Sequence, residues 1–407
     1  MLPVLVRFAL SALLLAMTVG PASARSLTVR FPRVVVPPGA AIELCAFVQV
    51  PRKKAFDLAQ YDIRHRGVGG SFSLAHFLVY VYQGTQLDGF AAGVVASRAC
   101  LELGPDDRDT RQLLFAGAAA RSRGTLPPGT AVRLQSAVGA TAIGFVLDAN
   151  FTNATDKPRT ASSVVRLRAA RRRTVKRLLQ PILERTAEEA LLVAPGTIGS
   201  TEQSTAAWNA AHVGEGSGFL RDAWVAPSGG ACVLRVTGHF HKRGRFFGVD
   251  FVDAQGTVTP GSGRPNPFEP GRQHLFGTAD YTDPGELAFT PPRLLRVGEL
   301  LHYGCWIDNG VTQPARLGCE ETTGVAPGTA RIAGGGAAKR CVQPGDLAPE
   351  CTPTDTAYPG RTFTGRCVAA NLVTGVTPND EVCQMAGFYY DVATAGTCDL
   401  SSEPVLP

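Results

Sequence analysis

The sequence predicts an all-β protein built from two β-sandwiches in tandem. Short runs rich in Val, Ile, Leu, Phe and Tyr recur along the 407 residues, and turn signals built from Pro, Gly and Asp separate them. Residues 126–153 and 291–310 also share an order of proline, glycine, apolar strands and an asparagine-containing turn. We interpret this echo as an internal duplication, although short echoes also arise by chance in β proteins. A hydrophobic content of 44% is enough for each of two domains to bury a core.

The N-terminus has the layout of a cleavable secretory signal. Arg7 precedes an apolar run over residues 8–19, and the small residues 22–24 follow a helix-breaking Gly20-Pro21 pair. We therefore expect residues 1–24 to be removed and the product to be secreted or periplasmic. No later stretch approaches the roughly 18 to 20 apolar residues that span a bilayer. We expect no membrane span after removal of the signal.

The expected domains are an N-terminal sandwich over 25–168, a connector over 169–190 and a C-terminal sandwich over 191–398. A basic stretch, residues 166–177, holds seven Arg and Lys and no acid, and contributes to a net charge of +6. No aromatic residue interleaves for base stacking, so we interpret it as a solvated connector and expect no nucleic-acid partner. Residues 171–190 also allow a helix broken at Pro181.

The ten cysteines indicate disulfides. Their number is even, all follow the expected signal, and none forms a CxxC pair, so structural disulfides are favoured over metal thiolates. Four of them lie in or beside a polar insertion over residues 318–366: Cys319, Cys341, Cys351 and Cys367. We expect these four to pair among themselves, with the pairing left open.

His239 and His241 are the most informative pair of side chains. They lie on residues 233–244, which read as a strand that ends in a turn. Side chains at i and i+2 of a strand share a face, so two imidazoles can converge on one metal ion or substrate. The alternative is a surface or partly buried pair without chemistry. The other histidines without a partner at metal-ligand spacing are expected to be structural or exposed: His65, His212, His274 and His302.

Motifs of other enzyme classes do not occur in the chain. It has no GxSxG nucleophile elbow, no HExxH zinc motif and no phosphate-binding loop. A pair of glycosidase carboxylates stays open, because such pairs leave no spacing signature.

Several blocks in a fixed order carry a family resemblance. They are IELCAFVQVP, SLAHFLVYVY, LLFAGAAARSRGTLPPGTAVRL, GFVLDANFTN, VTGHFHKRG, LLHYGCWIDN and TPNDEVCQMAGFYYD. In these blocks the chain resembles the copper type II, ascorbate-dependent monooxygenases, the family of peptidylglycine α-hydroxylating and dopamine β-monooxygenases. The resemblance implies two jelly-roll β-sandwiches, each with one copper, facing each other across a solvent-filled cleft. It also implies ascorbate as reductant and a small-molecule or peptide ligand in the inter-domain cleft.

The family's copper ligands transfer only in part. In the first domain, the adjacent histidine pair falls on Ala75 and His76 and the third histidine falls on Asn150, so this site is expected to be degenerate. His76 stays a candidate copper ligand, and the alternative is a strand histidine with an ordinary hydrogen bond.

In the second domain His239 and His241 match the family's histidines, whereas the methionine position falls on Val382. Met385 lies three residues farther along and needs a bulge or a shifted register to become a ligand.

The same resemblance implies three disulfides. It pairs Cys45 with Cys100, Cys305 with Cys383 and, more loosely, Cys232 with Cys398.

Two functions follow as expectations. The first is an exported copper type II monooxygenase-like protein that hydroxylates a C–H bond at a copper held by His239 and His241. The alternative is a non-catalytic secreted binding protein of two sandwiches that has lost the copper sites.

Overall fold

The computed structural model describes most of the chain after residue 25. The described residues are 26–51, 54–90, 93–96, 100, 111–186, 191–211, 222–281, 284–315, 317–321, 330–331, 363–373, 381–392 and 397–400. The expected signal at 1–24, His212 and most of the insertion at 318–366 lie outside them. None of the described helices is both long and apolar enough to span a bilayer.

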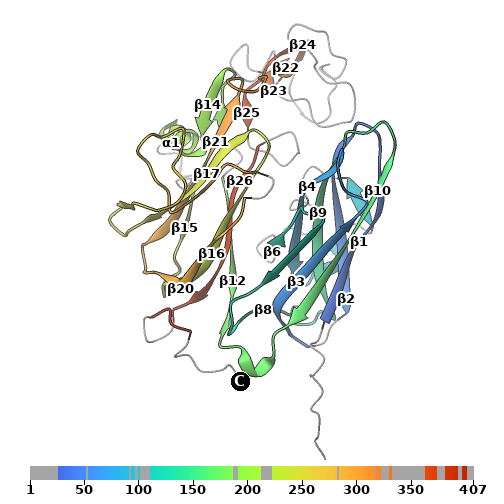
Figure 1. The fold of residues 1–407 in the computed structure, drawn as a ribbon, viewed down its shortest axis with the longest axis vertical. Coiled ribbons are helices and arrows are strands. Elements are labelled where there is room, and N and C mark those ends of the chain that lie inside the picture. The colour runs from blue at the N-terminus through green and yellow to red at the C-terminus, as the bar shows by residue number, and fades with distance from the viewer. Residues whose placement is uncertain are drawn as a thin grey trace, which may run out of the picture.

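The N-terminal half of the chain forms two facing sheets (Figure 1). One sheet has the strand order β1 (Ser26–Val36), β10 (Arg159–Ala169), β3 (Phe56–Arg66), β8 (Thr130–Leu134) and β11 (Arg177–Leu178), with β7 (Arg121–Thr125) on β3. The other has the order β5 (Val94–Ala96), β2 (Ala41–Pro51), β9 (Ala142–Asn153), β4 (Phe72–Tyr82) and β6 (Arg111–Ala116). Alternate residues of both sheets, such as Val165 and Phe145, are fully buried in one shared core.

The C-terminal half repeats this arrangement with its own core. One sheet has the order β12 (Gln180–Arg185), β26 (Cys383–Asp391), β16 (Ala231–Phe240) and β20 (Leu287–Leu295). The other has the order β14 (Thr197–Ser200), β21 (Leu300–Asn309), β17 (Gly244–Val252) and β18 (Val258–Thr259). In this second sheet β15 (Ala223–Val225) also pairs with β21, and β19 (Phe276–Thr278) pairs with β17. Val236, Phe247 and Met385 belong to the core between these sheets.

The remaining elements are short. A two-stranded sheet joins β13 (Leu192–Val193) to β25 (Leu372–Val373), and a three-stranded sheet has the order β23 (Ala330–Arg331), β22 (Leu317–Glu321), β24 (Phe363–Ala369). One α-helix, α1 (Thr201–Ala211), and two 3-10 turns, η1 (Leu87–Gly89) and η4 (Arg172–Thr174), complete the described elements. The protein is therefore all-β, as the sequence predicts. The jelly-roll connectivity stays a prediction.

The connector does not contain the broken helix that its sequence allowed. Its described part forms the turn η4, then β11, which extends the first sandwich, and β12, which extends the second. Pro181 fits because β12 lies at the edge of its sheet and pairs only with β26.

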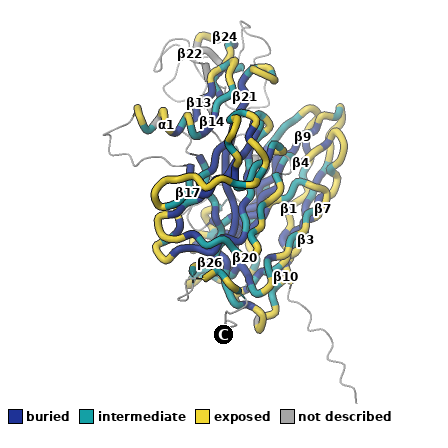
Figure 2. Tube along the Cα trace, turned by 60° about the vertical axis from the view of Figure 1, so that its left-hand side comes forward, coloured by how far each residue is buried: buried dark blue, intermediate teal, exposed yellow. Residues whose placement is uncertain are grey.

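The two sandwiches contact each other directly. Leu78, Tyr80 and Val146 on the outer face of the β2–β9–β4 sheet are buried in one cluster with Ala386 of β26, and Leu183 of β12 packs against it. Figure 2 shows buried segments running through the middle of the molecule, with the exposed residues gathered mainly at the turns. Part of the boundary where the resemblance implied a solvent-filled cleft is thus closed by an apolar contact among the described residues.

Three disulfides have the pairings that the resemblance implied. Cys45–Cys100, Cys232–Cys398 and Cys305–Cys383 have Cα–Cα distances of 5.4, 5.5 and 5.9 Å. Cys305 lies on β21 and Cys383 on β26, so this bond fastens the two sheets of the second sandwich to each other. Cys367 is also disulfide-bonded. Such bonds are typical of proteins that fold in an oxidising compartment.

Glu184 on β12 gives the fold a pH dependence. Burial raises the pKa of its carboxyl from 4.5 to about 7. The folded state therefore keeps a proton that the unfolded chain loses above pH 4.5, so its stability falls as the pH rises from about 4.5 to 7.

Glu184→Gln removes this titration. We expect the variant to exceed the parent in unfolding free energy by about 1 to 2 kcal/mol at pH 8 and to match it near pH 4. Urea unfolding at the two pH values measures this. The control Glu286→Gln, with a half-exposed side chain, should change stability by less than about 0.5 kcal/mol at either pH. An equal change at both pH values for Glu184→Gln would contradict the expectation.

Candidate metal centre between the sandwiches

Side chains alternate between the two faces of β16, and that of His239 points out of the second sandwich. Val236 and Phe240 point into the core of that sandwich, so His239 points to the opposite side, toward the first sandwich. On β26, Gln384 is the residue directly opposite His239, and it is buried on the same face. His241 follows one residue after β16 ends and is partly buried. Both rings contact the same residue, His76, as described below.

His76 lies on the facing sheet of the first sandwich. A register irregularity between Leu74 and His76 on β4 turns the His76 side chain away from the core that holds Phe77. Its cross-strand partner on β9 is Asn150, which in turn is opposite Glu43 of β2. Glu43, Asn150 and His76 therefore form a row of buried polar side chains across three strands.

The three histidines converge between the two sandwiches. The ring centroid of His76 lies 5.1 Å from that of His239 and 6.0 Å from that of His241. The His239 and His241 centroids are 5.4 Å apart. One ring nitrogen of each residue lies within 4.8 Å of the ring nitrogens of the other two, a spacing that one metal ion can bridge. His76, for which the sequence left open a ligand role and a structural role, is thus part of a cluster and not an isolated strand histidine.

Two carboxylates lie close to His76. Its Nε2 lies 3.4 Å from Oδ1 of Asp148, and Glu43, His76 and Asp148 form a second group whose donor atoms are mutually within 4.8 Å. A carboxylate beside one ring nitrogen favours the tautomer with its proton there, which leaves the other nitrogen as an electron-pair donor. The carboxylates therefore suit His76 to a ligand role.

The electrostatic setting keeps His239 neutral. Burial lowers the pKa of His239 well below 6.5, and the neighbouring His76 and His241 rings lower it further because a second positive charge beside them is unfavourable. Neutral imidazole is the form that binds a metal ion. His239 is thus in the ligating form at neutral pH.

Met385 does not belong to this centre. The register pairs Met385 with Gly238, one residue before His239, so its side chain lies on the opposite face of the sheet. It is fully buried in the core of the second sandwich with Phe247. The pairing of β16 with β26 is regular from Val236 to Phe240, so no bulge moves the Met385 thioether to the face that carries His239. The prediction of Met385 as a ligand is wrong for this reason.

The other described histidines have hydrogen-bonded structural positions. His65 contacts Oγ of Ser163 at 2.7 Å and is buried in the first sandwich. His274 contacts Oδ1 of Asp250 at 2.9 Å. His302 is partly exposed and lies 2.9 Å from Oε1 of Glu202.

Comparisons with known proteins add little to this geometry. No protein-family model matches the chain, and no curated protein sequence matches it. A solved structure described as the PBSX exported protein XepA is similar over 69% of this chain and 86% of that one, at 7% sequence identity and a TM-score of 0.17. A similarity of that size carries no argument about fold or function.

Proposed function

We propose that this chain is an exported metalloprotein that holds one copper ion between its two sandwiches through His76, His239 and His241. The observation that carries the proposal is the convergence of three imidazoles from two separate sheets. The proposal keeps the copper that the resemblance implies and replaces two separated sites with one shared site.

The donor set fits a transition-metal ion. Imidazole nitrogen suits copper and zinc, and divalent copper is bound most tightly among the first-row metals. Calcium and magnesium prefer oxygen ligands, which the three histidines do not supply. The carboxylates Glu43 and Asp148 lie beside His76, and a carboxylate partner is common for a metal-bound histidine.

Three protein ligands favour a reactive ion over a purely structural one. Structural sites are usually closed by four protein ligands, whereas catalytic sites keep one position open. His239 and His241 are only partly buried, so the ion would face solvent on their side. Copper supplies one-electron chemistry there, with ascorbate as the external donor that the resemblance implies.

Metal stoichiometry tests the proposal. The purified protein is loaded with copper, dialysed and analysed by elemental mass spectrometry. We expect about one ion per chain for the parent and about zero for His239→Ala/His241→Ala and for His76→Ala. The control Lys242→Ala alters the exposed neighbour of His241 and should keep the ion. A parent value near zero, or a value near one for His76→Ala, would contradict the shared site.

Ascorbate-dependent oxygen consumption then separates the two roles. An oxidoreductase should consume oxygen only when copper-loaded and should lose this activity in His76→Ala. A binding protein should hold the ion without consuming oxygen. The second result would leave the metal site standing and would reject the monooxygenase-like activity.

A further inference from the structure

A second site lies on the outer side of the second sandwich. A pocket of about 1040 Å³ opens between helix α1, β21, β17 and residues 271–273. Pockets that hold small organic ligands usually have volumes of about 300 to 1,000 Å³. Because His239 and His76 are not among its lining residues, this pocket is distinct from the candidate metal centre.

The pocket has an apolar wall. Ala206 of α1, Val252 of β17, Val258 of β18, Pro260 and Leu300 of β21 contribute to its lining. An apolar wall of this size favours a ligand with a hydrophobic body, because burying apolar surface stabilises the complex.

Two carboxylates, Glu202 and Asp222, and two basic side chains, Arg272 and His302, line the pocket, and His302 lies 2.9 Å from Oε1 of Glu202. Arg272 is the sole Lys or Arg among its described lining residues, and its guanidinium already contacts Glu202, Asp250 and Glu269. Burial alone would lower the pKa of Arg272, but the hydrogen bonds to Glu202 and Asp250 outweigh it and raise this pKa. The arginine is therefore balanced by its own partners.

Asp222 adds a further carboxyl to the lining. Its side chain is only 3% exposed and lines the pocket. Oγ1 of Thr205 donates to its Oδ2 at 2.7 Å. Burial raises the pKa of Asp222, and hydrogen bonds from Thr205 and Thr186 and the nearby His302 only partly oppose this rise. No described Lys or Arg forms an ion pair with this buried carboxyl, and a positively charged ligand group would relieve the cost of its burial.

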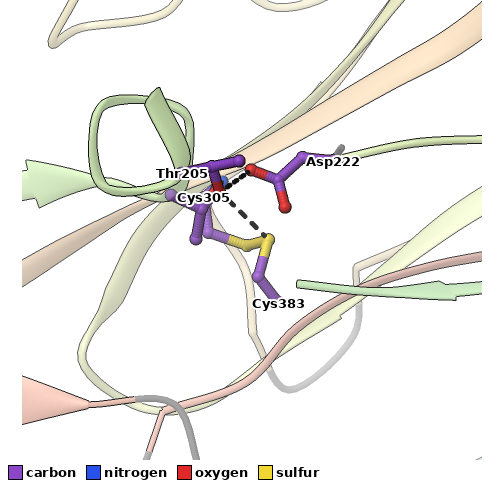
Figure 3. Close-up of a disulfide and its surroundings, with 5 residues drawn as sticks. Thr205, Asp222, Cys305 and Cys383 are labelled. Atoms are coloured by element: carbon purple, nitrogen blue, oxygen red, sulfur yellow. Dashed lines mark hydrogen bonds between the residues drawn. A yellow bond between two sulfur atoms is a disulfide. The ribbon is translucent and has the colours of Figure 1, made fainter. Parts of the chain in front are cut away.

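The wall that carries Asp222 is rigid. The main-chain oxygen of Asp222 accepts from the backbone N–H of Tyr303, and the backbone N–H of Cys305 donates to Oγ1 of Thr201 at 3.0 Å. Figure 3 shows the Thr205–Asp222 hydrogen bond beside the Cys305–Cys383 disulfide. These contacts tie α1 and Asp222 to β21, so the carboxyl is positioned before any ligand binds.

We propose that this pocket binds a small organic cation, with its protonated amine at Asp222 and Glu202 and its apolar body against Val252 and Leu300. The pocket supplies size, an apolar wall and, in Asp222, a buried carboxyl for which the described residues provide no Lys or Arg partner. The site acts independently of the metal centre.

Isothermal titration calorimetry of the full chain with tryptamine tests the proposal, with EDTA present so that copper does not bind the amine. We expect saturable binding, and binding of the neutral analogue tryptophol at least roughly ten-fold weaker, because a charged hydrogen bond is lost. Asp222→Asn should weaken tryptamine binding by a similar factor and leave tryptophol unchanged. The control Glu286→Gln, which removes a carboxylate at the far β20 edge, should bind tryptamine like the parent.

A second variant tests the pocket independently, in case Asp222→Asn does not fold. Ala206→Trp fills the pocket from an exposed helix position and should abolish binding of both compounds while the circular dichroism spectrum stays that of the parent. Equal affinity for tryptamine and tryptophol would overturn the proposal. So would absence of tryptamine binding at millimolar concentration, or unchanged affinity in Asp222→Asn.

Discussion

Copper should raise the stability of the parent protein by about 4 kcal/mol when its free concentration is 1,000 times the dissociation constant. The ion binds only the folded state, so its binding free energy adds to the free energy of unfolding. Because His76 comes from the first sandwich and His239 and His241 from the second, the stabilisation depends on both domains being folded and docked. Thermal unfolding of the full chain with and without copper measures the effect.

The single variant His76→Ala gives the decisive comparison. If the ion were held by the second sandwich alone, His76→Ala would keep most of the copper-dependent shift in the unfolding temperature. We expect the variant to lose the shift, as His239→Ala/His241→Ala does. Lys242→Ala should keep the parent's shift. A full shift in His76→Ala would show that the ion does not link the domains.

Strand alternation accounts for the part of the site that the sequence predicts. The placement of His239 and His241 on one side follows from a period of two residues, and the same period predicts that Met385 points away. His76 was a candidate ligand of a separate site, and its convergence with His239 and His241 was not predicted, because it depends on how the outer faces of two sheets pack together. That packing arises from contacts such as Leu78 with Ala386. The residue pattern of one strand does not show which other strand will pack against it.

Helix α1 shows a local signal that was overlooked. Ser200 and Gln203 form a capping box, in which the backbone N–H of Gln203 donates to Oγ of Ser200 at 3.1 Å and the backbone N–H of Ser200 donates to Oε1 of Gln203 at 3.4 Å. The spacing of serine and glutamine before an alanine-rich stretch predicts a helix start. Because the helix was not predicted, Glu202, the carboxylate on it that contacts His302 and Arg272, was not identified either.

The β-rich content was the easier prediction. Runs such as residues 144–153 alternate between a core side and an outer side, and both sides are buried because the sandwiches pack together. The connector was harder to predict. Its basic residues suit a helix as well as a strand, and its two short strands form only because β8 and β26 offer open edges.

Arg272→Met should lower the free energy of unfolding of the second sandwich by about 3 kcal/mol. The guanidinium holds α1, β17 and the loop before β19 together. Its Nη1 lies 2.8 Å from Oε2 of Glu202 and 2.8 Å from Oε2 of Glu269, and its Nε lies 3.2 Å from Oδ2 of Asp250. Methionine keeps much of the volume but leaves these carboxylates without their cation. The Asp250 side chain is only 1% exposed, so water does not replace the lost partner.

The pH dependence of the lost unfolding free energy shows whether Arg272→Met acts by removing ion pairs or by removing packing contacts. Burial alone would raise the pKa of Glu202, but hydrogen bonds from His302 and Arg272 outweigh it and lower this pKa from 4.5 to about 2. The pKa of Asp250 is likewise lowered, because contacts with His274 and Arg272 outweigh burial. Stability from a lowered carboxyl pKa is present above the unfolded-state value and is lost as the pH falls through the folded-state value.

The parent should therefore lose stability between about pH 5 and pH 2, and Arg272→Met should lose less over the same range, so that the two converge in acid. Urea unfolding at pH 7 and pH 3 measures this. Arg264→Met, which removes an exposed arginine from the same loop, should match the parent at both values. A deficit in Arg272→Met that stays constant with pH would indicate lost packing and would contradict the role of the guanidinium as the partner of Glu202 and Asp250.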